Sequence, residues 1–325
     1  MRASIQVHPS IGTVPLLPRL RLLGSSFGAH TSIRRGHGSD VAGSRPYQPG
    51  DDFHAIDWKA SARLSAAWQR DEFVVRDRQA EETPRVVIVC DRRPEMGLFP
   101  AELPWLHKPE ATAWSVRLLA ASAVNQRALV GYLDHASHES EGVAAGQPFW
   151  RPPRGQASGW HRDLVETLAG HVDGPRDAPE DAVEQGLRFL GLLRGVVTVG
   201  SFVFVLSDFL IEISDDAWGG ILGRGWDVVP VVIQDPVWEH TFPPMGGVAA
   251  TFSDVGGGRL LPTRLTAGEV ERLRRRNEER RASILETFAA AGLDYVDVSS
   301  SDPVSIHASF LRWADARLVH GGRLG

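Results

Sequence analysis

The sequence has little that would mark a secreted or membrane-spanning protein. It contains one cysteine, Cys90, in 325 residues, which excludes an intrachain disulfide framework and fits a reducing compartment. The most apolar stretch, residues 196–206, is too short to cross a bilayer and leads directly to Asp208. The first residues also lack the continuous apolar core of a signal peptide. We therefore expect a cytoplasmic protein without a membrane segment.

An excess of positive charge and the common catalytic motifs are also missing. The net charge is -5, whereas a dedicated nucleic-acid-binding protein usually has a basic excess. The chain has no His-Glu-x-x-His pattern, and no Gly-Lys-Ser/Thr follows the glycine run at 256–258. His135 and His138 have no third metal ligand near them in the sequence. We expect no nucleic-acid partner and find no complete catalytic constellation.

The most informative stretch runs from Arg45 to Arg63. Pro49-Gly50 favours a tight turn. A helix that begins after Asp57 would be capped by that carboxylate, with Trp58 and Ala62 on one face. One interpretation is a structural clamp, in which a buried Trp58 is flanked by ion pairs. The other is a docking surface, since tryptophan and arginine contribute strongly to binding at interfaces. Residue chemistry alone favours the clamp.

The sequence pattern changes after Pro84 and divides the chain into two regions. Residues 1–84 combine glycine, proline, arginine and aromatic residues with short strand-like segments, so we expect a small β-rich N-terminal region. In residues 85–325, buried apolar runs alternate with segments of helical periodicity. The expected strands are 85–90, 128–133, 201–206, 227–233 and 293–298, and the expected helices are 110–125, 163–168, 181–193, 266–291 and 303–318. This alternation predicts an α/β domain with a doubly wound, mostly parallel sheet.

Local signals refine this scheme at four places. The proline-rich stretch Arg151-Pro152-Pro153 predicts a loop, and Pro230 predicts a bulge or an edge in its strand. Thr266 and Glu269 have the spacing of a capping box that opens a long helix. Gly292 is placed to end that helix.

The stretch from Arg45 to Arg63 also resembles the signature of the domain-of-unknown-function 58 family. The resemblance covers about residues 24–314, including Arg34-Arg35-Gly36-His37-Gly38 ahead of the signature and Ser207-Asp208-Phe209 in the second half. His54 departs from the family, which usually has arginine there. The positions that match the signature are Arg45, Tyr47, Gly50, Asp51, Asp52, Ile56, Asp57, Trp58, Ala62 and Arg63.

This resemblance implies a von Willebrand factor A-like second half, with a metal site at the carboxyl ends of the strands. Such a site uses Asp-x-Ser-x-Ser, a threonine and a further aspartate, all of them oxygen ligands. The first motif reads Asp91-Arg92-Arg93-Pro94-Glu95 here, and the threonine position falls in Pro179-Glu180-Asp181, which has none. Both hydroxyl ligands and the threonine are therefore missing.

Asp91 and Asp208 each follow an expected strand, so both are predicted to reach this edge of the sheet. Arg93 adds fixed positive charge at the position of the cation and can pair bidentately with either aspartate. We expect a degenerate site that holds no metal and is a possible docking surface. An alternative is a carboxylate cage that retains a metal. The positions concerned are Asp91, Arg93, Glu95, Asp181 and Asp208.

Relatives in this family are commonly encoded beside MoxR-type AAA+ ATPases. The resemblance therefore implies a non-enzymatic interaction module, without a cofactor, that acts as an adaptor or partner of such an ATPase. Two other classes remain open. One is a metal-dependent hydrolase that uses the acidic crevice at Asp91 and Asp208, and the other is a structural module that self-associates.

Overall fold

The computed structural model describes residues 12–18, 41–47, 56–68, 73–78, 83–99, 103–135, 146–155, 176–193, 195–253 and 260–321. The chain forms two compact units, the small one from residues 20–84 and the large one from residues 1–19 and 85–325.

The first residues differ from the expected division, which placed all of residues 1–84 in one region. Val14 and Leu16 are buried in the core of the large unit. The backbone N–H of Val14 donates to Ser122 Oγ at 2.9 Å, which ties this segment to a helix of that unit. Val14 and Leu16 are not distinguished from the rest of residues 1–84 by composition, so the sequence did not predict that they belong to the large unit.

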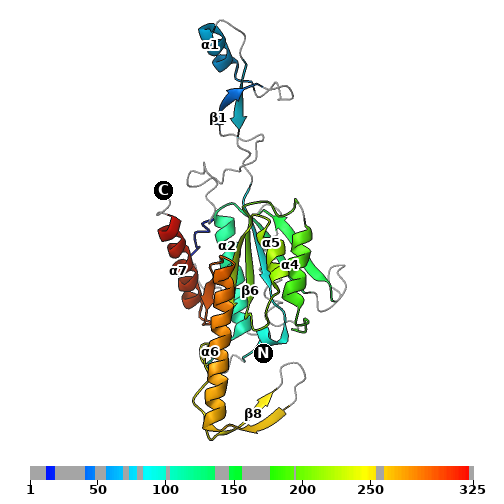
Figure 1. Ribbon diagram of the computed structural model, residues 1–325, viewed down its shortest axis with the longest axis vertical. Coiled ribbons are helices and arrows are strands. Elements are labelled where there is room, and N and C mark those ends of the chain that lie inside the picture. The colour runs from blue at the N-terminus through cyan, green and yellow to red at the C-terminus, as the bar shows by residue number, and fades with distance from the viewer. Residues whose placement is uncertain are drawn as a thin grey trace. The chain divides into compact units, whose positions relative to one another are not determined.

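Figure 1 shows the large unit with β6 of its central sheet labelled. The sheet has six strands in the order β10-β7-β6-β3-β4-β5. Neighbouring strands are parallel except for β4 and β5, which are antiparallel. The strands are β3 (Arg85–Cys90), β4 (Leu129–His135), β5 (Pro148–Arg154), β6 (Phe202–Ser207), β7 (Asp227–Ile233) and β10 (Val296–Val298). The predicted α/β fold with a mostly parallel sheet is confirmed.

Helices cover both faces of this sheet, and each face has its own hydrophobic core. The helices are α2 (Lys108–Asn125) and α7 (Pro303–Gly321) on one face, and α4 (Ala182–Leu192), α5 (Asp215–Leu222) and α6 (Ala267–Ala290) on the other. Side chains of one strand alternate between the cores: Val86 and Ile88 face the first, Val87 and Val89 the second. Burial on both faces explains why the strands are continuous apolar runs in the sequence.

Pro152 and Pro153 lie in β5 and not in the predicted loop. β5 pairs with β4 at the end of the sheet, and a strand at an edge tolerates residues that lack an N–H donor. Gly131 in β4 allows the close approach, because a Cβ at this position would lie 3.0 Å from Cγ of Pro153. The prediction of a loop is therefore wrong, because edge position removes the usual penalty of proline in a strand.

Pro230 lies inside the sheet, in β7, without a bulge. It is aligned with Val205 of β6 on one side. On the other side β10 pairs only with Val231–Ile233 among the described residues. The pairing with β10 thus begins one residue after Pro230, so Pro230 itself has a neighbouring strand on one side only. This agrees with the prediction of an edge at this proline.

The ends of α6 follow the sequence signals. The hydroxyl of Thr266 accepts a hydrogen bond from the backbone N–H of Glu269 at 3.2 Å, and the Glu269 carboxylate accepts from the backbone N–H of Thr266 at 2.7 Å. Gly292 follows the helix with φ +65°, the left-handed conformation of a helix end. A hairpin of β8 (Ala249–Ser253) and β9 (Leu260–Arg264) precedes the helix and was not expected.

In the small unit, β1 (Val41–Pro46) pairs antiparallel with β2 (Val74–Arg78), and α1 (Trp58–Trp68) lies between them in sequence. Asp57 caps α1 as predicted, with Oδ1 accepting from the backbone N–H groups of Lys59 and Ala60, both at 3.1 Å. Ser61 Oγ accepts from the backbone N–H of Val74 at 2.9 Å and connects α1 to β2. The expected helix at 163–168 and the glycine run at 256–258 lie outside the described residues.

Candidate functional site

Two aspartates lie where the strand order of the sheet reverses. From β3 the chain passes through α2 to β4 on one side, and a later crossover brings it to β6 on the other side of β3. Asp91 follows β3 and Asp208 follows β6, and the backbone N–H of Asp91 donates to the carbonyl of Leu206 at 2.9 Å. In open α/β sheets this edge is where ligands bind. The structure thus brings both aspartates to the expected place.

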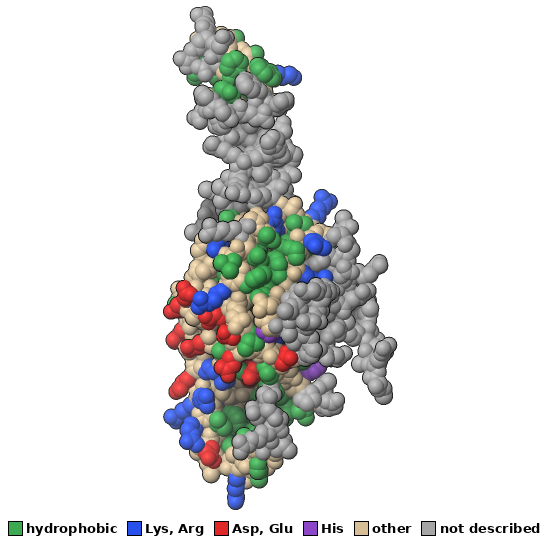
Figure 2. All heavy atoms as spheres, turned by 90° about the vertical axis from the view of Figure 1, so that its right-hand side faces the viewer, with side chains coloured by type: hydrophobic (Ala, Val, Ile, Leu, Met, Phe, Trp, Pro, Cys, Tyr) green, Lys and Arg blue, Asp and Glu red, His purple; other side chains and the backbone are tan. Residues whose placement is uncertain are grey.

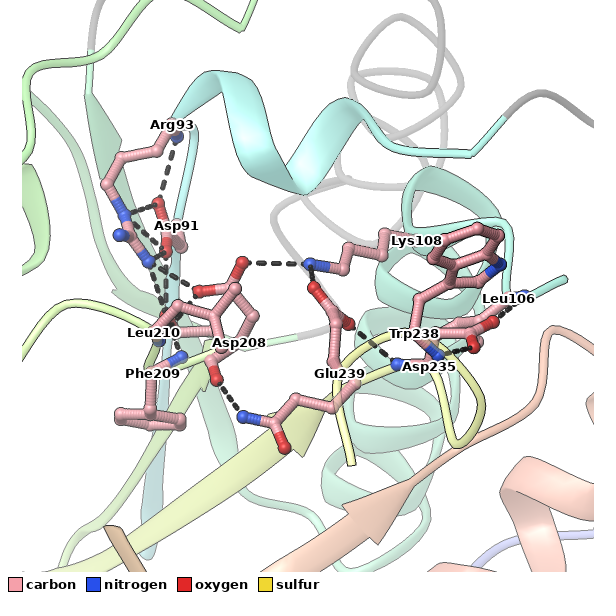
Figure 3. Close-up of polar contacts among 12 residues, drawn as sticks. Asp91, Arg93, Leu106, Lys108, Asp208, Phe209, Leu210, Asp235, Trp238 and Glu239 are labelled. Atoms are coloured by element: carbon pink, nitrogen blue, oxygen red, sulfur yellow. Dashed lines mark hydrogen bonds and ion pairs between the residues drawn. The ribbon is translucent and has the colours of Figure 1, made fainter. Parts of the chain in front are cut away.

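Arg93 connects the two aspartates (Figure 3). Its Nε lies 2.9 Å from Asp91 Oδ2, and its Nη2 lies 2.6 Å from the same oxygen and 2.7 Å from Asp208 Oδ1. All three side chains are buried, with Arg93 only 2% exposed. A planar guanidinium suits such a two-nitrogen contact with a carboxylate. A metal ion that used both aspartates would have to displace this group.

A second cation reaches the crevice from the first residue of α2. Lys108 Nζ donates to Asp208 Oδ2 at 2.8 Å and to Glu239 Oε1 at 2.6 Å. Its side chain is 0% exposed. Because α2 follows β3, its N-terminus lies at the carboxyl edge of the sheet. Each oxygen of Asp208 therefore has its own cation, Arg93 at Oδ1 and Lys108 at Oδ2.

The loop after β7 fixes Glu239 in this position. Asp235 closes a turn, with Oδ1 accepting from the backbone N–H of Trp238 at 2.9 Å and Oδ2 accepting from the N–H of Leu106 at 2.7 Å. The second oxygen of Glu239 accepts from the backbone N–H of Asp235 at 2.7 Å. Backbone donors thus satisfy the carboxylate oxygens that do not face Lys108. We call Asp91, Arg93, Lys108, Asp208 and Glu239 the charge cluster.

The groups of the charge cluster shift the pKa values of one another. Burial opposes the ionised form of Asp208, but Lys108 and Arg93 outweigh it and lower the pKa of this carboxyl group. Burial also opposes the charged form of Lys108, yet Asp208 and Glu239 raise its pKa above the ordinary value. Burial has the largest effect on Glu239 and raises its pKa, although Lys108 acts in the opposite direction. The pair of Lys108 and Asp208 is therefore charged at neutral pH.

The backbone after β6 adopts an unusual conformation beside Asp208. Phe209 has φ +53°, a region that bulky side chains rarely occupy. Ser207 Oγ accepts from the backbone N–H of Phe209 at 3.0 Å and donates to Asp91 Oδ2 at 2.6 Å. The ring of Phe209 is buried and stacks on Trp218. Hydrogen bonds and packing together hold this strained residue in place.

The carboxylate cage left open by the sequence is not formed. Asp181 is exposed at the start of α4, and its Oδ2 accepts from Gln185 Nε2 at 2.8 Å. Glu95 is half-buried in the short 3-10 helix η2 (Pro94–Gly97). Over the described ranges, no group of three His, Cys, Asp or Glu side chains is placed to hold a metal ion. Asp91 and Asp208 are instead bound by side-chain cations, Arg93 and Lys108.

Burial also corrects the predicted docking surface. Asp91, Arg93 and Asp208 were expected as possible contacts of a partner, but none of their side chains is more than 2% exposed. A partner therefore cannot reach them in this conformation. Of the five predicted positions, only Asp181 is exposed, and Glu95 is partly so.

On the face shown in Figure 2, acidic side chains gather toward the left-hand side of the large unit, with basic side chains among them. Asp215 and Asp216 occupy the first turn of α5, where negative charge complements the helix dipole. Arg188 pairs with Glu184 at 2.8 Å and with Asp216 at 3.0 Å. Helix-end electrostatics and exposed ion pairs account for Glu184, Asp215 and Asp216.

In the small unit the predicted clamp is wrong. Trp58 is 61% exposed, and the buried apolar residue beside it is Ile56. The reason is the orientation of α1, which turns Ser61 toward β2 and leaves Trp58, Ala62 and Arg63 exposed. Arg45 is in β1, and Tyr47 is the first residue after this strand. The backbone N–H of Tyr47 donates to the carbonyl of Phe73 at 2.8 Å. The signature positions Gly50, Asp51 and Asp52 lie outside the described residues.

Sequence reasoning missed Lys108 and Glu239. A signal for Lys108 existed, because a helix that directly follows the first strand starts at the carboxyl edge, so its first residue lies beside the crevice. Glu239 gave no such signal. It belongs to a loop whose turn depends on backbone contacts with Asp235.

The fold and the charge cluster define an α/β protein whose strand-end aspartates are bound by its own cations. The family model described as "Protein of unknown function DUF58" matches residues 43–282. This is more than half of the chain, which therefore belongs to the DUF58 family. No curated protein matches the chain.

Solved structures with similarity to this chain come from several bacteria. BatB from Bacteroides thetaiotaomicron is 15% identical, over 72% of this chain and 99% of that chain, with a TM-score of 0.38. An aerotolerance-related membrane protein from Bacteroides fragilis is 15% identical, over 70% and 99%, also with 0.38. The pilus adhesin SpaC from Lactobacillus rhamnosus GG is 12% identical, over 74% and 30%, with 0.40. Within the described residues, no helix is both long and apolar enough to span a membrane.

Proposed function

We propose that this chain is a non-enzymatic interaction module with a von Willebrand factor A-like large unit. Its partner would be a MoxR-type AAA+ ATPase, for which it acts as an adaptor in chaperone-like assembly. The partner follows from the family resemblance of the signature between Arg45 and Arg63. The single buried cysteine, Cys90, supports a place in the reducing cytoplasm.

The observation that carries this proposal is the charge cluster. Metal-dependent catalysis in this crevice would need open ligand positions on Asp91 and Asp208. Arg93 and Lys108 hold those oxygens instead, and both cations are buried. The hydrolase alternative would require both cations to leave, with several buried carboxylates then unpaired. The cluster supports a rigid scaffold whose action lies in its surface contacts.

Co-purification with the ATPase tests this proposal. The full chain is mixed with a purified MoxR-type ATPase from the same cell, in the presence of ATP, of ADP and of neither nucleotide. We expect a complex that weakens from 0.1 M to 1 M salt, because the screening length falls from about 10 Å to about 3 Å. A general phosphatase and peptidase assay of the isolated chain should show no turnover. Absence of a complex under every nucleotide condition, or robust hydrolysis, would contradict the proposal.

A further inference from the structure

One face of α1 is exposed and combines apolar and basic side chains. Trp58, Ala62 and Ala66 recur at four-residue spacing and form a stripe, and Lys59 and Arg63 form a second stripe beside it. All five are exposed. We call this set the Trp58 face. α1 carries no acidic residue, so the charge along this face has one sign.

The aromatic part of the Trp58 face is held in place before any partner binds. The ring of Trp58 meets Phe73 edge to face, with centroids 6.1 Å apart and an interplanar angle of 82°. Phe73 is itself 44% exposed, so the two rings form a continuous apolar surface. The cap at Asp57 and the bond from Val74 to Ser61 fix the helix beneath them. A preorganised anchor reduces the entropy lost on binding.

We propose that the Trp58 face binds an acidic, amphipathic helix of a protein partner. The partner's apolar residues would cover Trp58 and Phe73, and its carboxylates would pair with Lys59 and Arg63. The alanines at 62 and 66 add little bulk, so a second helix can approach closely. Tryptophan and arginine are the residues most enriched among strong interface contacts. This inference concerns the surface and the chemistry of its partner, and it does not depend on the ATPase being that partner.

A lipid surface fits this face less well. A helix that lies in a membrane interface needs a broad apolar face, usually with several leucine or phenylalanine residues. The exposed stripe of α1 offers one tryptophan and two alanines. The small apolar area with flanking cations favours a protein helix that supplies both apolar contacts and carboxylates.

Site-specific photo-crosslinking tests the inference. The photo-reactive residue p-benzoylphenylalanine replaces Ala62 in the full chain, and a control chain carries it in place of Val304, which is 73% exposed on α7. After irradiation in extract of the native cell, crosslinked peptides are mapped. We expect a segment with Asp or Glu at helical spacing that crosslinks at position 62 and not at 304.

Reversal of the charges at Lys59 and Arg63 then distinguishes specific docking from nonspecific crosslinking. Lys59→Glu with Arg63→Glu should cut the yield at position 62 about tenfold, and changing the mapped carboxylates to lysine should restore it. Trp58→Ala should abolish the crosslink while the melting temperature stays near that of wild type, because the side chain is exposed. Equal yields at 62 and 304, a neutral or basic mapped segment, or a crosslink to a second copy of the chain would overturn the inference. Binding to phosphatidylserine vesicles that is lost in Trp58→Ala would assign the face to membranes instead.

Discussion

Asp208 pairs with two buried cations, Arg93 at one carboxylate oxygen and Lys108 at the other. Because these cations belong to side chains, the local charge balance is a property of the folded chain. The energetic consequence is that neither cation can be removed alone. A buried carboxylate without its partner is strongly unfavourable, whereas an exposed one is solvated by water.

The first prediction follows from this asymmetry. Lys108→Met keeps much of the side-chain volume but leaves Asp208 and Glu239 without the ammonium group, and should cost about 3–5 kcal/mol in the free energy of unfolding. Urea denaturation measures the change. The control is Arg188→Met, which removes an exposed ion pair on α4 and should have little effect. Equal stabilities of the Lys108→Met variant and wild type would show that the cluster is not a stabilising unit.

Asp134 lies in β4, which neighbours β3 on the side away from β6. It supports a prediction about how the stability of the protein depends on pH. Burial raises its pKa to about 7, although Arg92 opposes this, and its Oδ2 accepts from the hydroxyl of Tyr132 at 3.0 Å. An unfolded aspartate ionises near pH 4, so between about pH 4 and 7 the folded state holds a proton that the unfolded state releases. Stability should therefore fall as the pH rises through this window.

Asp134→Asn isolates this effect. Between pH 5 and 8 the wild type should lose about 3 kcal/mol more of its unfolding free energy than the variant, because the amide does not titrate. Urea denaturation of both proteins at the two pH values gives the difference. The same pH dependence in both would mean that Asp134 is ionised in the folded state throughout.

Not every residue of the site was predictable from the sequence. The sequence predicted the positions of Asp91, Arg93 and Asp208, because residues that follow a buried strand must lie at the carboxyl edge of the sheet. The exposure of Trp58 was not predictable, since the rotation of α1 depends on the bond between Ser61 and Val74, and sequence spacing alone does not fix it. Glu239 was missed because its position depends on a turn built from contacts distant in sequence.

At the scale of elements, helices and central strands follow from periodicity, because burial on both faces leaves a clear apolar run. The edge strand β5 and the hairpin of β8 and β9 could not be predicted from periodicity. β5 contains the prolines at 152 and 153, and its acceptability depends on the glycine opposite, Gly131. Contacts of this kind appear only when the partner strand is known.

The capping box of α6 provides the prediction at this scale. Thr266→Ala removes the acceptor for the backbone N–H of Glu269 and should destabilise the protein by about 1 kcal/mol. Thr266→Ser keeps the hydroxyl and should retain most of the stability. Chemical denaturation of the two variants side by side checks this, and equal losses would show that the hydroxyl bond is not the source.

For the molecule as a whole, the two units carry different roles in this account. The large unit supplies a closed scaffold in which the strand-end carboxylates are neutralised from within. The small unit presents exposed aromatic and basic side chains on α1.

Titration with Mg²⁺ and Mn²⁺ measures whether the charge cluster can accept a metal ion. Thermal melts of the full chain are recorded in EDTA and at increasing millimolar metal concentration. A metal present at 100 times its dissociation constant would stabilise the protein by about 2.7 kcal/mol, which a melt detects readily. Because Arg93 and Lys108 hold the oxygens of Asp91 and Asp208, we predict no saturable change in melting temperature. A saturable rise that disappears in Asp91→Asn would show that a metal displaces these cations, and would contradict the account.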